Sequence, residues 1–132
     1  MKGDGGVAVD QQLDALTHAI IDAIITVHRV LGPGFLEGVY QRALMIELAK
    51  RDLSVKTEME VTVEYEGQLV GRHRVDLVVG DRVLVELKTV EDLHPAHYAQ
   101  VRAYLRATKL RTGLLVNFSK ERADYRRVMI GE

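Results

Sequence analysis

Two short apolar runs on either side of a tight turn constrain the fold of this chain more than any other feature of its sequence. Every second residue of each run is apolar, and these residues are Val75, Leu77 and Val79 in the first run and Val83, Val85 and Leu87 in the second. Successive side chains of a strand point to opposite faces, and paired residues of adjacent antiparallel strands point to the same face. Both trios therefore point into one core only if Val79 pairs with Val83 across a three-residue turn.

The same register gathers charged residues on the opposite face of this hairpin. Asp76 lies across from Glu86, and Lys88 follows on the same side two residues further along. Because Val78 and Leu84 share that face, the charges would be partly buried, and isolated buried charges cost free energy. The set is a functional site, a structural cluster of charges, or the exposed face of a hairpin.

As a functional site, this charged face is suited to bind a divalent cation. Two carboxylates a few ångströms apart repel each other unless a cation lies between them. Oxygen ligands with few protein contacts suit Mg²⁺ or Mn²⁺, and the backbone carbonyl of Leu87 is a candidate for a further ligand. A metal held by Asp76, Glu86 and Leu87 would polarise a phosphodiester. Lys88 would orient or deprotonate a water molecule, or stabilise charge in the transition state.

The rest of the chain predicts one α/β domain with a mixed sheet. Residues 1–11 are glycine-rich and polar, which predicts a flexible N-terminal tail, and residues 12–132 form the domain. Apolar residues at helical spacing predict helices, and apolar residues at every second position predict strands. Gly or Pro marks the boundaries between these elements. These are helices over 13–31, 35–51 and 95–108, and strands over 55–65, 69–79, 83–89, 114–118 and 126–130.

Composition excludes several classes of protein and leaves a metal site with oxygen ligands open. A chain of 132 residues without Cys has no disulfide scaffold, no thiolate zinc site and no cysteine nucleophile. The net charge of −1 argues against coating of nucleic acid by bulk electrostatics. That total combines −6 for residues 1–93 with +5 for residues 94–132, where a basic stretch from Arg102 to Arg127 could contact phosphate.

Membrane insertion and export are not expected. No apolar run approaches the roughly 18 residues needed to cross a bilayer. The first ten residues also lack the apolar core of a signal peptide. We therefore expect a cytoplasmic protein that does not contact membranes.

Three motifs together resemble those of one nuclease superfamily. Asp76, nine further residues and then Glu86-Leu87-Lys88 resemble the PD-(D/E)XK signature, with Val75 in place of the usual proline. The segment 34–40 fits the GxxExxY pattern that names a small family within this superfamily. His97, Gln100 and Tyr104 resemble its HxxQxxxY helix, which is similar to the QxxxY motif of RecB-like and phage exonucleases. The resemblance covers about residues 20–128.

The resemblance implies a restriction-endonuclease-like α/β fold, with a mixed β-sheet flanked by helices in the order α-α-β-β-β-α-β(β). Asp76 and Glu86 would hold Mg²⁺ or Mn²⁺, and Lys88 would be catalytic. Glu37 would approach the site from its helix as a further acidic ligand or an anchor for water. Gln100 and Tyr104, on one helical face, would steady the site or touch substrate phosphate.

Several of these residues also have simpler explanations. Glu37 lies near a helix N-terminus, where acids are favoured in any case. Gln100 and Tyr104 could form an ordinary polar edge of a helix. Tyr40 is expected to pack in the core, and His28 is expected to be a capping or core histidine outside the site.

The sequence is compatible with three functions. The first is a Mg²⁺-dependent nuclease that hydrolyses phosphodiester bonds of DNA or RNA, which the intact set Asp76, Glu86 and Lys88 favours. The second is a catalytically inactive module of the same fold that binds nucleic acid or another protein, which the low net positive charge and small size favour. The third is a metal-dependent enzyme acting on a smaller phosphate ester. A symmetric homodimer is a reasonable expectation for so small a domain.

Overall fold

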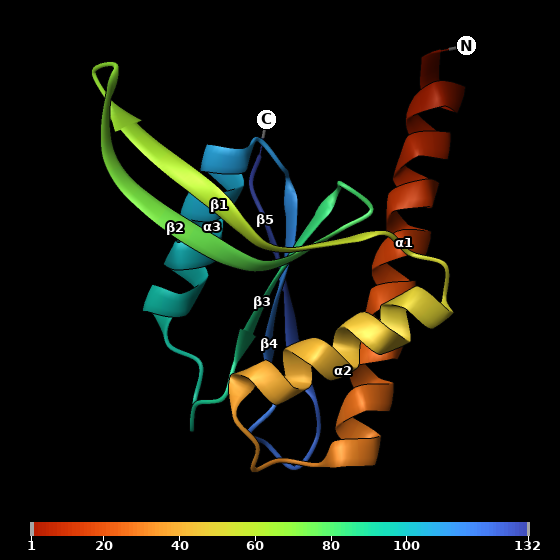
Figure 1. Ribbon diagram of the computed structural model, residues 1–132. Helices are drawn as coiled ribbons and strands as arrows, with labels where there is room; N and C mark the ends of the chain where they lie inside the picture. The colour runs from red at the N-terminus through yellow and green to blue at the C-terminus, as the bar shows by residue number, and fades with distance from the viewer. Residues whose placement is uncertain (1, 132) are drawn as a thin grey trace.

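A five-stranded sheet organises the molecule (Figure 1). The computed structural model describes residues 2–131, and side chains from residue 11 onward. The strands, in their spatial order, are β1 (Val55–Tyr65), β2 (Gln68–Val79), β3 (Val83–Lys88), β4 (Thr112–Asn117) and β5 (Asp124–Met129). Only β3 and β4 are parallel among these neighbours, so the sheet is mixed as predicted.

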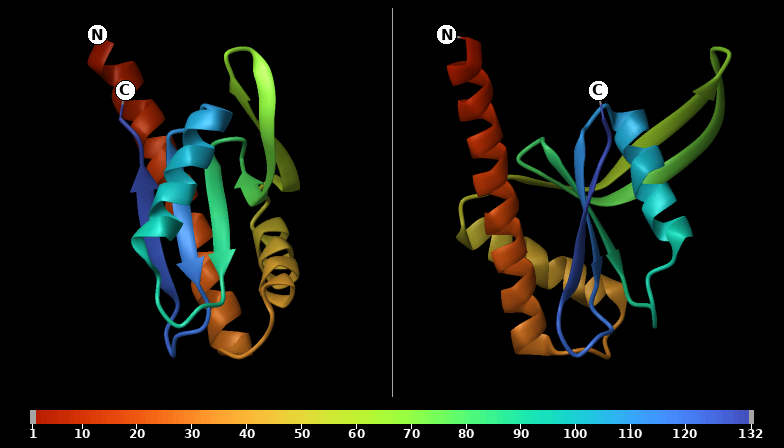
Figure 2. Two further views of the ribbon diagram at one scale, coloured as in Figure 1. Left: turned by 90° about the vertical axis from the view of Figure 1, so that its left-hand side faces the viewer. Right: turned by 180° about the vertical axis from the view of Figure 1, so that it is seen from behind.

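Helices cover both faces of this sheet (Figure 2). They are α1 (Lys2–Leu31), α2 (Glu37–Lys50) and α3 (Pro95–Thr108), so the predicted order of elements is confirmed. Residues of α1 and α2 pack in one core with Val83, Val85 and Leu87 of β3. Residues of α3 pack in a second core with Leu84 of β3 and Leu115 of β4. The alternation along β3 thus supplies both cores.

The hairpin between β2 and β3 has the predicted register. Val79 pairs with Val83 and Leu77 pairs with Val85, across the three-residue turn. All four side chains are fully buried. Within the turn, Gly80 has φ of 61° and Asp81 has φ of 57°. Such left-handed conformations suit Gly and are tolerated by Asp, so the turn chemistry agrees with the register.

One detail of the hairpin prediction is wrong, because Val75 does not share a core with Leu77. Val75 packs in the core beneath α3, whereas Leu77 packs in the core beneath α1 and α2. The pairing of β1 with β2 passes from Thr57–Leu77 to Met59–Val75, and the intervening Glu58 has φ of 53°. This local change of backbone direction turns the outer part of the hairpin formed by β1 and β2. That part of the hairpin projects away from the rest of the sheet (Figure 1). The site described below lies at the same place.

Helix α1 begins at Lys2, whereas its apolar periodicity begins at Leu13. The backbone thus continues as a helix into the segment for which we predicted a flexible tail. The side chains of residues 1–10 lie outside the described residues, and the domain boundary after residue 11 stays a prediction. Among residues 2–131, no helix combines the length and the apolarity needed to span a bilayer.

Candidate active site

Asp76 of β2 and Glu86 of β3 form the centre of the candidate site, and a backbone N–H holds each carboxylate. The Asp76 N–H donates to Glu86 Oε1 at 3.0 Å, and the Leu87 N–H donates to Asp76 Oδ2 at 2.8 Å. These bonds take over where the backbone pairing of the two strands ends, at Leu77 and Val85. Among the described residues, no donor contacts the other two oxygens, Asp76 Oδ1 and Glu86 Oε2.

Burial disfavours the ionised form of both carboxyl groups. Glu86 is 5% exposed, and desolvation followed by repulsion from Asp76 raises its pKa from the ordinary 4.5 to about 8. Desolvation also raises the pKa of Asp76, although the hydrogen bond from Leu87 opposes the change. A divalent cation between the two groups would favour their ionised forms and so offset this cost.

Helix α3 contributes a polar face to the same site. Lys88 Nζ donates to Gln100 Oε1 at 2.9 Å, so the side-chain amide of Gln100 fixes the position of the lysine ammonium group. Tyr104, one turn further along the helix, is 7% exposed. Desolvation raises the pKa of its hydroxyl, and the nearby charges of Glu86 and Asp76 raise it further. The predicted grouping of Gln100 and Tyr104 beside the carboxylates is therefore present.

Glu37, the first residue of α2, approaches the site from the other side. Its side chain is half-buried, and desolvation raises its pKa. Repulsion from Asp76 and Glu58 raises it further, while attraction to Lys88 lowers it. Glu37 therefore lies within electrostatic reach of both Asp76 and Glu86.

Tyr40 anchors the turn that leads into α2. Its fully buried ring stacks on Phe118 with centroids 4.3 Å apart. Its hydroxyl donates to the Gly32 carbonyl at 2.6 Å and accepts from the Phe35 N–H at 3.2 Å. The predicted packing role of Tyr40 is confirmed, and it fixes the helix start that carries Glu37.

Gln41 and Glu58 are two further residues at the site that the sequence analysis did not identify. Gln41 Nε2 donates to Glu58 Oε2 at 2.9 Å and to the Asp76 carbonyl at 3.1 Å. Glu58 lies in β1 among glutamates that alternate with apolar residues, a pattern typical of the exposed face of a strand. The hydrogen bond from Gln41, a left-handed backbone and repulsion of Asp76 distinguish Glu58 from the other glutamates of β1. None of these properties can be read from the sequence.

The residues present fit a hard divalent cation bound largely by water. Across the described part of the chain, no three His, Asp or Glu side chains come together as a ready metal site. Mg²⁺ commonly takes only one or two protein carboxylates and keeps several waters, so Asp76 and Glu86 suffice. The N–H and C=O of a strand residue face the same neighbouring strand, so the Leu87 carbonyl faces β2, as its N–H does. It therefore stays a candidate for the third ligand.

The histidines near the site have structural partners. The His94 N–H donates to His97 Nδ1 at 2.9 Å, so His97 closes the first turn of α3. Desolvation and the charge of Lys88 lower the pKa of His97. His28 is buried, and its Nε2 donates to the Lys120 carbonyl at 2.7 Å. The predicted role of His28 as a core residue outside the site is confirmed.

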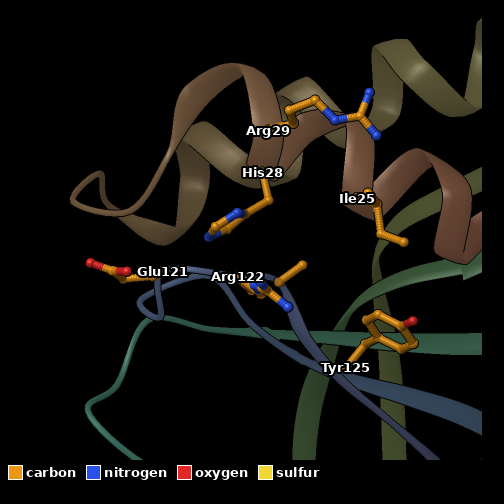
Figure 3. Close-up of a pocket in the computed structure, with 7 residues that line it drawn as sticks. Ile25, His28, Arg29, Glu121, Arg122 and Tyr125 are labelled. Atoms are coloured by element: carbon orange, nitrogen blue, oxygen red, sulfur yellow. The ribbon is translucent and has the colours of Figure 1, made fainter.

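The basic residues of the C-terminal part are divided between ion pairs and separate cavities. Three of them pair with carboxylates, namely Lys120 with Asp92, Arg126 with Asp124 and Arg127 with Asp14. Others line separate cavities. One cavity of about 370 Å³ lies between α1 and the segment that joins β4 to β5, and its lining includes His28, Arg29, Arg122 and Tyr125 (Figure 3). None of the predicted site residues lines this cavity.

Comparison with known proteins agrees with the geometry. A family model described as the PD-(D/E)XK nuclease superfamily matches residues 14–128. The fold is similar to that of SSO0001, with a TM-score of 0.57 and 19% identity over 72% of this chain and 50% of the other. It is also similar to an alkaline exonuclease from Laribacter hongkongensis, with a TM-score of 0.53 and 14% identity over 71% of this chain and 56% of the other. The chain spans about half the length of these two proteins, and no curated protein sequence matches it.

Proposed function

Because the chain belongs to the PD-(D/E)XK nuclease superfamily, we propose that it is a metal-dependent nuclease that hydrolyses phosphodiester bonds of DNA or RNA. One observation carries the proposal. Glu86 is buried and Asp76 beside it is half-buried, both have raised pKa values, each leaves one oxygen without a donor among the described residues, and Lys88 lies on the same face. The similarity in fold to an alkaline exonuclease is consistent with this reaction.

The roles of the residues follow from their contacts. Asp76, Glu86 and the Leu87 carbonyl would hold Mg²⁺ or Mn²⁺, which supplies a Lewis acid for the phosphodiester when bound. Gln100 orients Lys88 so that its remaining N–H groups face a phosphate oxygen or the attacking water. Glu37, half-buried at the start of α2, would accept a hydrogen bond from that water. Tyr104 would donate a hydrogen bond from its hydroxyl to an oxygen of the substrate phosphate.

Calorimetric titration with Mn²⁺, followed by a cleavage assay, tests this proposal. We expect Mn²⁺ binding that Glu86→Gln abolishes, and metal-dependent cleavage of single-stranded, duplex or structured DNA or RNA. Lys88→Ala should abolish cleavage while leaving Mn²⁺ binding largely intact, because the lysine is not a ligand. Glu64→Gln, on the exposed part of β1, is the matched control and should change neither property.

The outcomes separate the alternatives. Absence of Mn²⁺ binding at millimolar concentration would overturn the enzymatic proposal. Binding of nucleic acid without cleavage would favour the inactive module of the same fold. Cleavage of small phosphate esters alone would favour the third function. The proposed homodimer is tested separately, by the molar mass in solution, and the proposed cytoplasmic location by fractionation of cells.

A further inference from the structure

A cavity of about 230 Å³ lies at the far end of β3 from the candidate active site, and the proposed reaction does not use it. It lies between α1, the turn joining β2 to β3, and the segment joining α3 to β4. Its lining includes three cations, Arg82, Lys109 and Arg111. Strand β3 begins at Val83, next to this cavity, and carries Glu86 three residues further on, so at about 3.3 Å per residue the centre of the candidate active site lies roughly 10 Å away along the strand. We refer to it as the Arg82 cavity.

Among the side chains of residues 11–131, none of the three cations of the Arg82 cavity has an acidic partner. Asp81 also lines the cavity, but its carboxylate pairs with Lys56 at 2.8 Å. In the part of the chain whose side chains are described, no carboxylate lies within ion-pair distance of Arg82, Lys109 or Arg111. The dipole of α3 favours a cation at its C-terminal end, which accounts for Lys109 but not for the two arginines. An anion bound in the cavity would interact favourably with this unpaired positive charge.

Thr112 provides a second and independent indication of a ligand. This residue also lines the Arg82 cavity and is 2% exposed. Its Oγ1 has no hydrogen-bond partner, and no other buried side-chain N or O atom among the described residues shares this property. A buried hydroxyl without a partner destabilises the folded protein. Because a threonine hydroxyl changes position by rotation about χ1, it can donate to an acceptor in the cavity.

We propose that the Arg82 cavity binds a phosphate-type oxyanion. Arg82 and Arg111 supply planar guanidinium groups that match the oxygens of a phosphate, and Lys109 adds a third positive charge. Thr112 donates a hydrogen bond to one of the oxygens. The ligand is either a free phosphate group or a phosphodiester of a nucleic acid, since both present the same oxygens. Because the acidic residues of the candidate active site take no part, this binding does not depend on metal.

Titration of the ¹⁵N-labelled protein with inorganic phosphate, in EDTA and at constant ionic strength, tests this inference. We expect saturable shifts of the backbone amides of residues 81–82 and 109–112. Arg82→Gln and Arg111→Gln should each weaken binding about tenfold or more, as expected for loss of a charged hydrogen bond. Arg102→Gln, an exposed arginine of α3 that does not line the cavity, is the control and should leave the affinity unchanged.

Two further measurements complete the test. Thr112→Val should raise the melting temperature without phosphate, because it removes the unpartnered hydroxyl, and should weaken phosphate binding. A short oligothymidylate without terminal phosphate distinguishes the ligand sources: shifts at the same amides identify a phosphodiester, and their absence identifies a free phosphate group. Shifts spread over the whole surface, or equal phosphate affinity of wild type and Arg82→Gln, would overturn the inference. Since EDTA removes divalent metal, neither result bears on the proposed nuclease activity.

Discussion

The raised pKa of Glu86 predicts that neutralising this residue stabilises the metal-free protein in a pH-dependent manner. The carboxyl has a pKa of about 8 in the folded protein and an ordinary value of 4.5 in the unfolded chain. Between these values the folded state binds more protons than the unfolded state, so the free energy of unfolding falls as the pH rises. At pH 8 this cost is on the order of 4 kcal/mol, at about 1.4 kcal/mol for each tenfold change in proton affinity.

Glu86→Gln removes the charge while keeping an oxygen that can accept from the Asp76 N–H. We therefore expect the variant to be more stable than wild type at pH 8 by up to about 4 kcal/mol, or roughly 15 °C in melting temperature. At pH 5 both side chains are largely neutral in the folded protein, and the difference should be below about 1 kcal/mol. Urea unfolding in EDTA at the two pH values, followed by circular dichroism, measures both quantities.

Mn²⁺ should reverse the order of stabilities at pH 8. A metal that binds only the folded state stabilises it, so wild type should gain and Glu86→Gln should not. Glu64→Gln, whose carboxyl is exposed, should match wild type under every condition. A stability change in Glu86→Gln that is the same at pH 5 and pH 8, or a loss of stability at pH 8, would refute the reasoning from desolvation.

Three further predictions concern the surroundings of the site. Gln41→Leu removes the donor that holds Glu58 against β2, so calorimetry should show Mn²⁺ affinity about tenfold weaker; unchanged affinity would mean that this contact does not position the site. Tyr40→Phe deletes a buried hydroxyl that makes two hydrogen bonds in the turn before α2, so urea unfolding should show a loss of about 1–3 kcal/mol, and a smaller loss would mean that water replaces the hydroxyl. Gly113→Ala places a Cβ 2.9 Å from Val101 Cγ1, so urea unfolding should show a loss of about 1–3 kcal/mol in the free energy of unfolding. An unchanged free energy would show that α3 can move away from the sheet.

Much of the fold was predictable because its determinants are local. Alternating apolar residues and a compatible turn specified that Val79 pairs with Val83, as observed. Pro95 at the first turn and helical periodicity predicted α3 with the bounds that the structure shows. The placing of Asp76 opposite Glu86 followed from the same register, since the pairing within one hairpin depends on the residues of its two strands and of the turn between them.

The environment of the site was less predictable because it depends on contacts between distant segments. The motifs indicated Gln100 and Lys88, but their hydrogen bond joins α3 to β3. Gln41 and Glu58 carried no signal, since their hydrogen bond joins α2 to β1 and no glycine marks the left-handed backbone at Glu58. The separation of the chain into an acidic and a basic part likewise did not predict where positive charge lies on the folded protein. Several cations pair with nearby acids, while others line the Arg82 cavity.

The sequence by itself thus determined the strands, the hairpin register and the placing of Asp76 opposite Glu86, because apolar periodicity and turn chemistry act over a few residues. The tertiary structure decided how strongly these carboxyl groups are desolvated and which side chains surround them. Desolvation depends on everything packed around a group, and Glu37 of α2 and Tyr104 of α3 both lie within electrostatic reach of Glu86. The same packing turns two acids of a hairpin into a site where a divalent cation would be stabilised.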